Sequence, residues 1–434
     1  MSTTIRIDHL ARVEGHGGVT VEMEGGAVRG VQFDVFEGAR LLEGLVKGRS
    51  YEDISPVLSS ICAICSVAHS LTSLKATENA FGVEVSPQTE ALRDLLSLGE
   101  SIESHALHLF FLAIPDYLNY PSAVALAADN LPAVQLGLRL KKLGNTIQET
   151  VGGRAVHPVN AVLGGFGRVP GFDQLAELRA ALAGAAADCE TMLEIVAGLP
   201  AASFFRAGIA FGALVSPREY GYYAGEEVTM ALDGESETIP APEYKRFTNE
   251  RAVPHSHAKH STYNGRPYMV GSLARLVVNR ARLGERGLAA MKRLGLRFPP
   301  DNPTDNNKAQ AVELVNDVDR ALRIVESLLE HGLKDEPPVP VAPRAGAGTG
   351  ITEAPRGILI HSYVYDEAGR LTAADVITPT AINAASIEDH LRRAAENAAP
   401  GEEAALTRAF EMIVRAYDPC ISCSVHVVRR GHDG

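Results

Sequence analysis

The sequence has few cysteines and no long apolar run, and each absence excludes a class of protein. Five cysteines in 434 residues are too few for a disulfide framework. No stretch of about 18 apolar residues is present, which argues against a membrane span. The N-terminus enters a strand-like alternation without an apolar signal segment. We therefore expect a cytoplasmic protein.

Basic residues and nucleotide-binding motifs are also scarce. The 41 Lys and Arg residues are outnumbered by 53 Asp and Glu residues, which gives a formal net charge of -12. This balance disfavours nucleic acid or an anionic membrane as a partner. The glycine-rich segment at residues 152–167 fits neither a P-loop nor a dinucleotide-binding fingerprint, so we do not expect this chain to bind a nucleotide.

The apolar pattern predicts a mostly helical α+β fold, with a helical bundle between two small antiparallel sheets. Period-two alternation predicts the first sheet over about residues 1–36, and further strands at 357–365 and 371–377. Helical periodicity fills a core over about residues 38–333, with one helix starting near Cys62. Its longer helices are expected at residues 88–114, 130–151, 172–198 and 305–333.

The C-terminal part follows a segment rich in proline and glycine at residues 334–350, which is typical of a linker. Beyond the strands, helices are expected at residues 384–396 and 402–417. We find no internal repeat. The expected organisation is one domain over residues 1–426.

Four of the five cysteines form two Cys-x-x-Cys pairs, Cys62 with Cys65 and Cys420 with Cys423. This spacing lets two thiolates face one centre, and thiolates bind zinc, iron, nickel or copper. A zinc ribbon has about 15 to 20 residues between its pairs, whereas roughly 350 separate these. A buried catalytic centre fits that distance better, although the cysteines alone leave an iron-sulfur cluster open. Cys189 stands alone and is expected in the core.

Histidines and charged residues near glycine give further candidates. Residues 12–16 read Arg-Val-Glu-Gly-His between two expected strands, which is typical of a loop that aims side chains at a site or of a solvated polar turn. His69 lies four residues after Cys65, one helical turn away. The run at residues 255–260 contains three histidines that could bind a metal or face solvent.

Five motifs in order resemble the large, catalytic subunit of a nickel-iron hydrogenase. They extend over nearly the whole chain. The motifs are Arg-x-Glu-Gly-His (12–16), Cys-x-x-Cys-x-x-x-His (62–69), Gly-Gly-Arg-x-x-His-Pro (152–158), Ala-Pro-Arg-Gly (354–357) and Asp-Pro-Cys-x-x-Cys-x-x-His (418–426).

This resemblance implies a nickel-iron centre that cleaves dihydrogen reversibly. It implies that Cys62 and Cys420 are terminal ligands of nickel, whereas Cys65 and Cys423 bridge nickel to an iron that carries carbon monoxide and cyanide. It also implies that Cys420 takes the proton when dihydrogen splits heterolytically, and that Glu14 passes this proton outward.

The resemblance assigns the surroundings of the centre as well. Arg356 is expected over the open metal position, with the backbone at Pro355 and the side chain of Thr380 around the diatomic ligands. Asp418 is expected to pair with Arg356, and His69 to donate a hydrogen bond to a bridging sulfur.

A magnesium ion and a removable tail are two further implications. Glu43 and His426 resemble the family's magnesium ligands. Residues 427–434 resemble the extension that a maturation endopeptidase removes once nickel chaperones have loaded the site. Ser60 and Ala63 depart from the usual residues beside the first pair, and residues 104–108 (Ser-His-Ala-Leu-His) resemble the soluble bidirectional branch, which includes NAD(P)-linked enzymes and sulfhydrogenases.

Electron transfer requires partners, because no cysteine remains for an iron-sulfur cluster in this chain. The resemblance implies a small subunit that carries such clusters, and flavin- and NAD(P)-binding subunits beyond it. The face around residues 12–16 and Cys62 is the expected interface. The alternatives are a non-hydrogenase structural subunit of the respiratory complex I type, in which the nickel cysteines are lost, and a zinc-stabilised scaffold.

Overall fold

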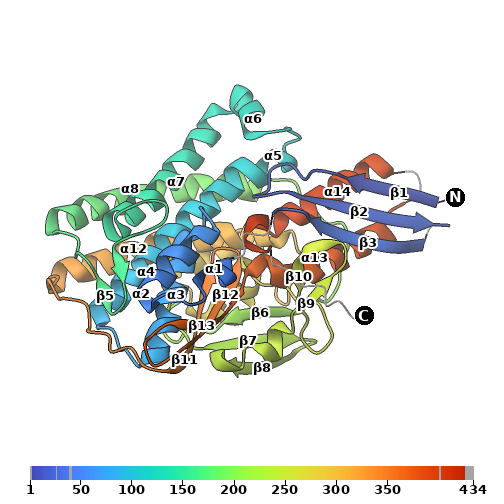
Figure 1. Ribbon diagram of the computed structural model, residues 1–434. Coiled ribbons are helices and arrows are strands. Elements are labelled where there is room, and N and C mark those ends of the chain that lie inside the picture. Colours follow the sequence, from blue (N-terminus) through green and yellow to red (C-terminus); the bar gives the residue numbers. More distant parts are fainter. Residues whose placement is uncertain (1, 26, 39–41, 400–401, 426–434) are drawn as a thin grey trace, which may run out of the picture.

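The computed structural model describes residues 2–25, 27–38, 42–399 and 402–425. Long helices lie side by side, and five small antiparallel sheets are found in the described part of the chain (Figure 1). The predicted α+β class is therefore confirmed. None of the described helices could cross a lipid bilayer.

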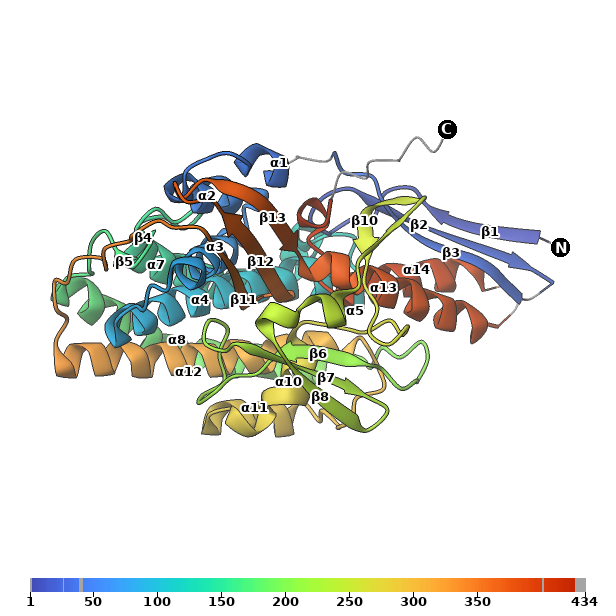
Figure 2. The same cartoon turned by 60° about the horizontal axis from the view of Figure 1, so that its bottom comes forward.

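The N-terminal sheet has three strands in the order β1-β2-β3: β1 (Ser2–Ile7), β2 (Gly17–Glu24) and β3 (Ala27–Val35). Val19 and Val21 of the central strand β2 are buried, and Val21 lies opposite Ile5 and Val31 in the two flanking strands. This is the period-two pattern expected of a half-buried sheet. The helices α13 (Pro379–Glu396) and α14 (Glu403–Ala416) lie beside this sheet in both views (Figure 1, Figure 2).

The helical body is built from five long helices whose apolar faces meet in one core. They are α3 (Ser66–Phe81), α4 (Pro87–Leu107), α7 (Leu131–Gly152), α8 (Phe172–Gly198) and α12 (Asp305–His331). The shorter helices are α1 (Leu42–Val46), α2 (Tyr51–Leu58), η1 (Ser59–Ile61), α5 (Ile114–Tyr117), α6 (Ala123–Asp129), η3 (Ala241–Glu243), α9 (Lys245–Thr248), α10 (Ser272–Asn279), η4 (Arg280–Arg282), α11 (Glu285–Arg293) and η5 (Ile421–Cys423).

Four further sheets complete the described fold. One contains β6 (Phe211–Leu214), β7 (Glu227–Leu232) and β8 (Glu235–Pro240), and another contains β11 (Gly346–Ala354), β12 (Gly357–Tyr365) and β13 (Leu371–Ile377). The two-stranded sheets are β4 (Ala161–Val162) with β5 (Gly165–Phe166), and β9 (Arg251–Val253) with β10 (Ser256–His260). The bounds of β12, β13 and α8 agree with the sequence prediction.

The predicted helix at residues 88–114 is interrupted by a π-helical segment, η2 (His108–Ala113). This wider turn lies between α4 and α5, and π turns are frequent at functional sites. The side chain of His108 is buried there, with Nδ1 against Gln310 Oε1 and Nε2 2.7 Å from the carbonyl of Arg415. The interruption therefore brings the helix into contact with the chain just before the second cysteine pair.

The first cysteine pair lies in a loop, not in a helix as predicted. Helix α3 begins at Ser66, and Cys65 occupies its N-cap position. The pair therefore lies between η1 and α3, where the backbone can turn both sulfurs toward one point.

The predicted linker at residues 334–350 is wrong at its C-terminal end, because residues 346–350 belong to strand β11. The alternate glycines Gly346, Gly348 and Gly350 face α3. A Cβ atom at Gly348 would lie 2.2 Å from the carbonyl oxygen of Ala76, and one at Gly350 would lie 2.3 Å from that of Thr72. Glycine is therefore required because the strand packs directly on the helix backbone.

Candidate metal centre

The four paired cysteines converge at one buried point. Their sulfur atoms all lie within 4.8 Å of one another. Cys62 Sγ is 3.3 Å from Cys420 Sγ, and Cys65 Sγ is 3.5 Å from Cys423 Sγ. These separations exceed a disulfide bond, and the cysteines are free. Sulfurs that share one metal ion at about 2.3 Å lie about 3.3 to 3.8 Å apart, so the spacing fits a metal centre.

The loop of the first pair is fixed by the start of α3. The carboxylate of Glu100 on α4 accepts the N–H of Val67 (2.7 Å) and that of Ala68 (3.1 Å). It thereby binds backbone N–H groups at the N-terminus of the helix, which have no hydrogen-bond partner within the helix itself. Cys65 N–H also points to Cys62 Sγ at 3.2 Å, the short-range bond that a Cys-x-x-Cys turn allows.

The glycine, arginine and histidine motif at residues 152–158 flanks the same loop. The backbone N–H of His157 donates to Ser66 Oγ (2.9 Å), and its Nδ1 lies 3.2 Å from the carbonyl of Ser59. His157 adopts a positive φ of 53°, a conformation that is strained for a residue with a side chain. The motif therefore contacts the chain on both sides of the first cysteine pair, at Ser59 before it and at Ser66 after it.

The loop at residues 12–16 holds the second pair. The backbone of Glu14 pairs with that of Cys420, and Ile421 N–H donates to the Glu14 carbonyl at 2.9 Å. Gly15 has φ of +86°, and a Cβ atom there would lie 2.8 Å from Ser422 N. Only glycine combines this φ with this close approach. On the other side, Cys420 N–H donates to Thr380 Oγ1 (2.9 Å) at the start of α13.

The side chain of Glu14 contacts a cysteine sulfur. Its Oε2 lies 3.2 Å from Cys420 Sγ and accepts the backbone N–H of Ser422 at 3.1 Å. Its Oε1 accepts the hydroxyl of Ser422. Glu14 is partly exposed, whereas Cys420 is buried. The carboxylate therefore lies between the sulfur cluster and the surface, within reach for proton transfer.

Arg356 is a buried cation near the sulfurs. Its Nε donates to the carbonyl of Asp418 (2.7 Å), and its Nη2 donates to Asp418 Oδ1 (3.1 Å). Burial opposes the charge, yet Asp418 and the cysteine sulfurs keep the pKa of Arg356 well above its ordinary value. Its Nη1 is buried without a hydrogen-bond partner. Asp418, also held by Gln310 Nε2 (3.2 Å), adopts φ of +50°.

Comparisons with known families show to which family this chain belongs. The profile of the family described as nickel-dependent hydrogenase matches residues 40–152 and 217–426, and a profile described as HoxL-like matches residues 4–37. The chain belongs to the nickel-dependent hydrogenases. It is thus an oxidoreductase that acts on dihydrogen, and the resemblance seen in the five motifs is confirmed.

Individual relatives of this hydrogenase cover almost its full length. It is 40% identical to the alpha chain of sulfhydrogenase 1 of Pyrococcus furiosus, over 98% of both chains. It is 36% identical to the alpha chain of sulfhydrogenase 2 of the same organism, over 98% of this chain and 99% of that one. Among solved structures, an NAD+-reducing [NiFe]-hydrogenase in the H2-reduced state superposes with a TM-score of 0.85, at 26% identity, over 98% and 99% of the two chains.

The residues of this hydrogenase fit a nickel-iron centre. Thiolates are soft donors that suit nickel and iron. Burial raises the pKa of the Cys420 and Cys423 thiols well above the ordinary value, so a cation among the sulfurs is required to keep these two as thiolates. The unpartnered Nη1 of Arg356 leaves one donor for a group at the centre.

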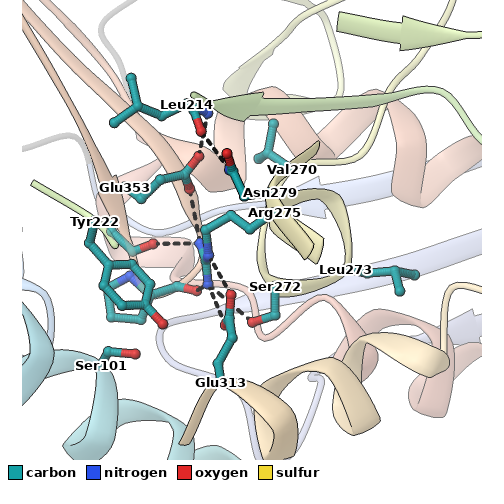
Figure 3. A network of polar contacts seen from close by, with 12 residues as sticks. Ser101, Leu214, Tyr222, Val270, Ser272, Leu273, Arg275, Asn279, Glu313 and Glu353 are labelled. Carbon is teal, nitrogen blue, oxygen red and sulfur yellow. Dashed lines mark hydrogen bonds and ion pairs between the residues drawn. The ribbon is translucent and has the colours of Figure 1, made fainter. Parts of the chain in front are cut away.

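A buried polar network supports the Pro355–Arg356 segment of the hydrogenase. Figure 3 shows Arg275, from α10, between Glu353 and Glu313. Arg275 Nε and Nη2 donate to the Glu313 carboxylate at 2.7 and 2.8 Å, and Nη1 donates to Glu353 Oε2 at 2.9 Å. The same guanidinium donates to the carbonyl of Pro355 at 2.8 Å.

The two carboxyl groups of this network differ in pKa. Burial raises the pKa of Glu353 to about 7, although the Arg275 charge opposes this shift. Burial favours a neutral carboxyl, yet the Arg275 charge keeps the pKa of Glu313 well below its ordinary value. Two further groups touch Glu313: His105 Nε2 lies 2.8 Å from Oε2, and the hydroxyl of Tyr220 donates to Oε1. Pro355 is therefore held by a guanidinium that is itself fixed by two carboxylates.

His69 and Glu43 contact groups other than the cysteine sulfurs. His69 is buried, and its Nδ1 lies 3.1 Å from His361 Nε2, so a bond to a sulfur would have to come from its own Nε2. Glu43 is half-buried, and its Oε1 accepts the N–H of Val376 at 2.8 Å. His426 and the tail at residues 427–434 lie outside the described residues. Cys189 is buried in the core, apart from the cluster.

Sequence reasoning misses Arg275, Glu313 and the cap formed by Glu100. A signal for Arg275 exists in the sequence, because it stands in the apolar stretch Leu273 to Val278 of a helix. A cation on an apolar helix face needs a buried carboxylate. The sequence does not say which carboxylate, since Glu313 lies 38 residues away and Glu353 lies 78 residues away.

Proposed function

We propose that this hydrogenase is the catalytic subunit of a cytoplasmic heteromeric enzyme that couples reversible cleavage of dihydrogen to NAD(P) or a similar soluble carrier. The observation that carries the catalytic assignment is the contact of Glu14 with Cys420 beside three further sulfurs. The choice of carrier is supported by the likeness to an NAD+-reducing enzyme and to the alpha chain of a sulfhydrogenase.

The four cysteines would hold the metals, with Cys62 and Cys420 terminal on nickel, and Cys65 and Cys423 bridging to an iron that carries carbon monoxide and cyanide. The two sulfurs within each proposed pair lie close together. Cys62 lies 3.3 Å from Cys420, its fellow terminal ligand, and Cys65 lies 3.5 Å from Cys423, its fellow bridging ligand. When bound, this centre supplies the site at which dihydrogen is cleaved heterolytically.

Side chains of the protein would accept the proton and transfer it toward the surface. Cys420 Sγ would take it, and Glu14 Oε2 at 3.2 Å would receive it next. The hydroxyl of Ser422 on Glu14 Oε1 orients the carboxylate and gives the proton a second polar contact toward the surface. The buried guanidinium of Arg356 would stabilise the charge separation.

Other residues would complete the site. Pro355 and Thr380 would surround the diatomic ligands, His69 would donate to a bridging sulfur, and Asp418 would keep Arg356 in place. Glu43, with His426, would bind magnesium, and the contact of Glu43 with Val376 N–H would fix its carboxylate.

Electrons would leave through an iron-sulfur small subunit, with flavin- and NAD(P)-binding subunits beyond it. The proposed interface includes the face around residues 12–16 and Cys62. Ala63, between the first two cysteines, is exposed. Val156 of the neighbouring motif and Val159, directly after that motif, expose 45% and 56% of their surface. Exposed apolar residues beside a buried metal centre suit a docked partner.

Co-expression with nickel maturation factors, with an iron-sulfur small subunit and with flavin- and NAD(P)-binding subunits tests this proposal. We expect nickel and iron in the purified complex, infrared bands of carbon monoxide and cyanide, and reduction of NAD+ or NADP+ by dihydrogen. Zinc without those bands would favour the zinc-stabilised scaffold. Dihydrogen oxidation with an artificial dye, but with neither NAD+ nor NADP+, would support the assignment as a hydrogenase and contradict the proposed electron carrier.

Maturation has its own test. The mature chain would end at His426 after an endopeptidase removes residues 427–434. Mass spectrometry of the active enzyme is expected to show this shortened chain, and an active enzyme that retains the tail would refute the processing step.

A further inference from the structure

A second group of metal-ligating side chains lies outside the cysteine centre. His255 and His260 come from the β9–β10 hairpin, and Glu388 comes from α13. One ligand atom from each of the three lies within 4.8 Å of the other two. Two imidazoles and one carboxylate are the ligands of several zinc sites.

The distances place the carboxylate between the two rings. Glu388 Oε1 lies 2.7 Å from His255 Nε2, and Oε2 lies 3.7 Å from His260 Nδ1. The second distance is too long for a hydrogen bond. It is close to the separation of about 3.3 to 3.6 Å between nitrogen and oxygen atoms that share one zinc ion at about 2.0 to 2.2 Å.

His260 gives the second, independent observation. Its surface is 1% exposed, and its Nε2 is buried without a hydrogen-bond partner. The other ring nitrogen, Nδ1, is the one that lies 3.7 Å from Glu388 Oε2. A buried nitrogen without a partner destabilises the fold, so the chain keeps His260 in its core at a cost that binding of a metal ion by the same ring would offset.

The other two side chains keep contact with solvent. His255 and Glu388 expose about one fifth of their side chains, 20% and 19%. Solvent can therefore supply a water as the fourth ligand and admit the ion. Glu388 Oε1 also accepts the N–H of Phe33 in β3 at 2.9 Å, which orients the carboxylate as outer contacts orient metal ligands.

We propose that His255, His260 and Glu388 form a second metal site that binds one zinc ion, with water as the fourth ligand. The ion would join the hairpin to α13. Ala258, on the hairpin strand β10, pairs with Val425, two residues after Cys423. The site thereby stabilises the hairpin against which the chain after the second cysteine pair is paired.

Zinc and nickel analysis of the purified holoenzyme tests the proposal. We expect about one zinc per chain in addition to the nickel of the cysteine centre, and zinc binding at least about tenfold weaker after His255→Gln or Glu388→Gln. Zinc X-ray absorption is expected to show nitrogen and oxygen at about 2.0 to 2.1 Å. Because imidazole also suits nickel, nickel must be counted in every variant.

His257→Gln is the matched control. His257 lies on the same strand, is exposed, and bonds through Nδ1 to the carbonyl of Glu37 instead of Glu388. This variant is expected to keep its zinc. The infrared bands and nickel content of the cysteine centre, unchanged in all variants, show that each has folded and matured.

Three results would overturn the proposal. The first is a wild-type enzyme with no more zinc than the His255→Gln variant after equilibration with zinc ions alone. The second is an equal loss of zinc in His257→Gln, which would indicate an adventitious ion only. The third is sulfur at about 2.3 Å around the zinc, which would place the ion among the cysteines.

Discussion

Glu14 and Cys420 are 406 positions apart in the chain, yet the carboxylate oxygen of one lies 3.2 Å from the sulfur of the other. The same two residues also pair through their backbones. The proposed proton acceptor and the sulfur that supplies the proton are therefore held by main-chain contacts as well as by a side-chain contact.

Replacement of Glu14 by glutamine is expected to lower dihydrogen turnover by at least about a hundredfold, the scale of a lost proton-transfer group. Glutamine can still accept the N–H of Ser422, so nickel content and infrared bands should stay unchanged. A dye-linked dihydrogen oxidation assay measures the loss. Glu37→Gln is the control, at a half-buried residue whose carboxylate accepts the N–H of His16, and it is expected to keep wild-type turnover. Activity of Glu14→Gln within about threefold of wild type would contradict the relay.

Gly15→Ala is expected to weaken nickel loading, because the added Cβ would lie 2.8 Å from Ser422 N and 2.9 Å from Ile421 Cβ. The second cysteine pair must then move. Gly48→Ala is the matched control, since Gly48 has a similar φ of +84° but open space around it. Metal analysis of both variants separates backbone strain, which they share, from the contact that Gly15 alone makes. Equal nickel in the two variants would argue against the contact.

Arg275→Met is expected to destabilise the chain by about 3 to 5 kcal/mol, because two buried carboxylates lose their cation. Chemical denaturation measures the loss, and a shift of the infrared bands is expected as well, since Pro355 loses its donor beside the centre. Arg139→Met removes a comparable two-point ion pair with Asp188 at the surface. That control is expected to cost less than about 1 kcal/mol.

Asp317→Asn is expected to change how stability depends on pH. Asp317 is fully buried between Ser101 and Tyr222, at 2.6 and 2.7 Å, and burial raises the pKa of its carboxyl from 3.8 to about 7. The folded chain then binds more protons than the unfolded chain between about pH 4 and pH 7, so this group lowers the free energy of unfolding as pH rises through that window.

Asparagine does not titrate, so the variant should gain stability relative to wild type as pH rises from about 4 to about 7. The gain can reach a few kcal/mol, since one pKa unit corresponds to about 1.4 kcal/mol. Denaturation at several pH values measures the difference between the two proteins. Parallel curves for wild type and variant would mean that Asp317 is ionised throughout.

The sequence predicts those parts of the fold and the site that depend on local pattern or on residue type. Strands β12 and β13 show alternation, and helix α8 shows sustained periodicity, so their bounds agree with the prediction. The cysteine pairs are recognisable because few other residues bind soft metals. Their convergence at one point depends on tertiary contacts and follows from the family resemblance, not from spacing.

The features that sequence reasoning misses depend on contacts between distant residues. The glycines of β11 have the composition of a linker, and only the backbone of α3 beside them explains why they form a strand. The sequence places the start of α3 too early, because the apolar residues near Cys62 continue the helical pattern of Cys65 and Ala68. Arg275 escapes detection because its carboxylate partners belong to other elements.

The glycine strand β11 has a mechanical consequence. With no side chains between them at Gly346, Gly348 and Gly350, α3 and β11 cannot slide past each other without a clash of main-chain atoms. Cys65 directly precedes α3, and Arg356 follows β11 by two residues. A metal-binding sulfur and the guanidinium near it therefore belong to one rigid body, so vibration or partner docking elsewhere would displace them together and preserve their spacing.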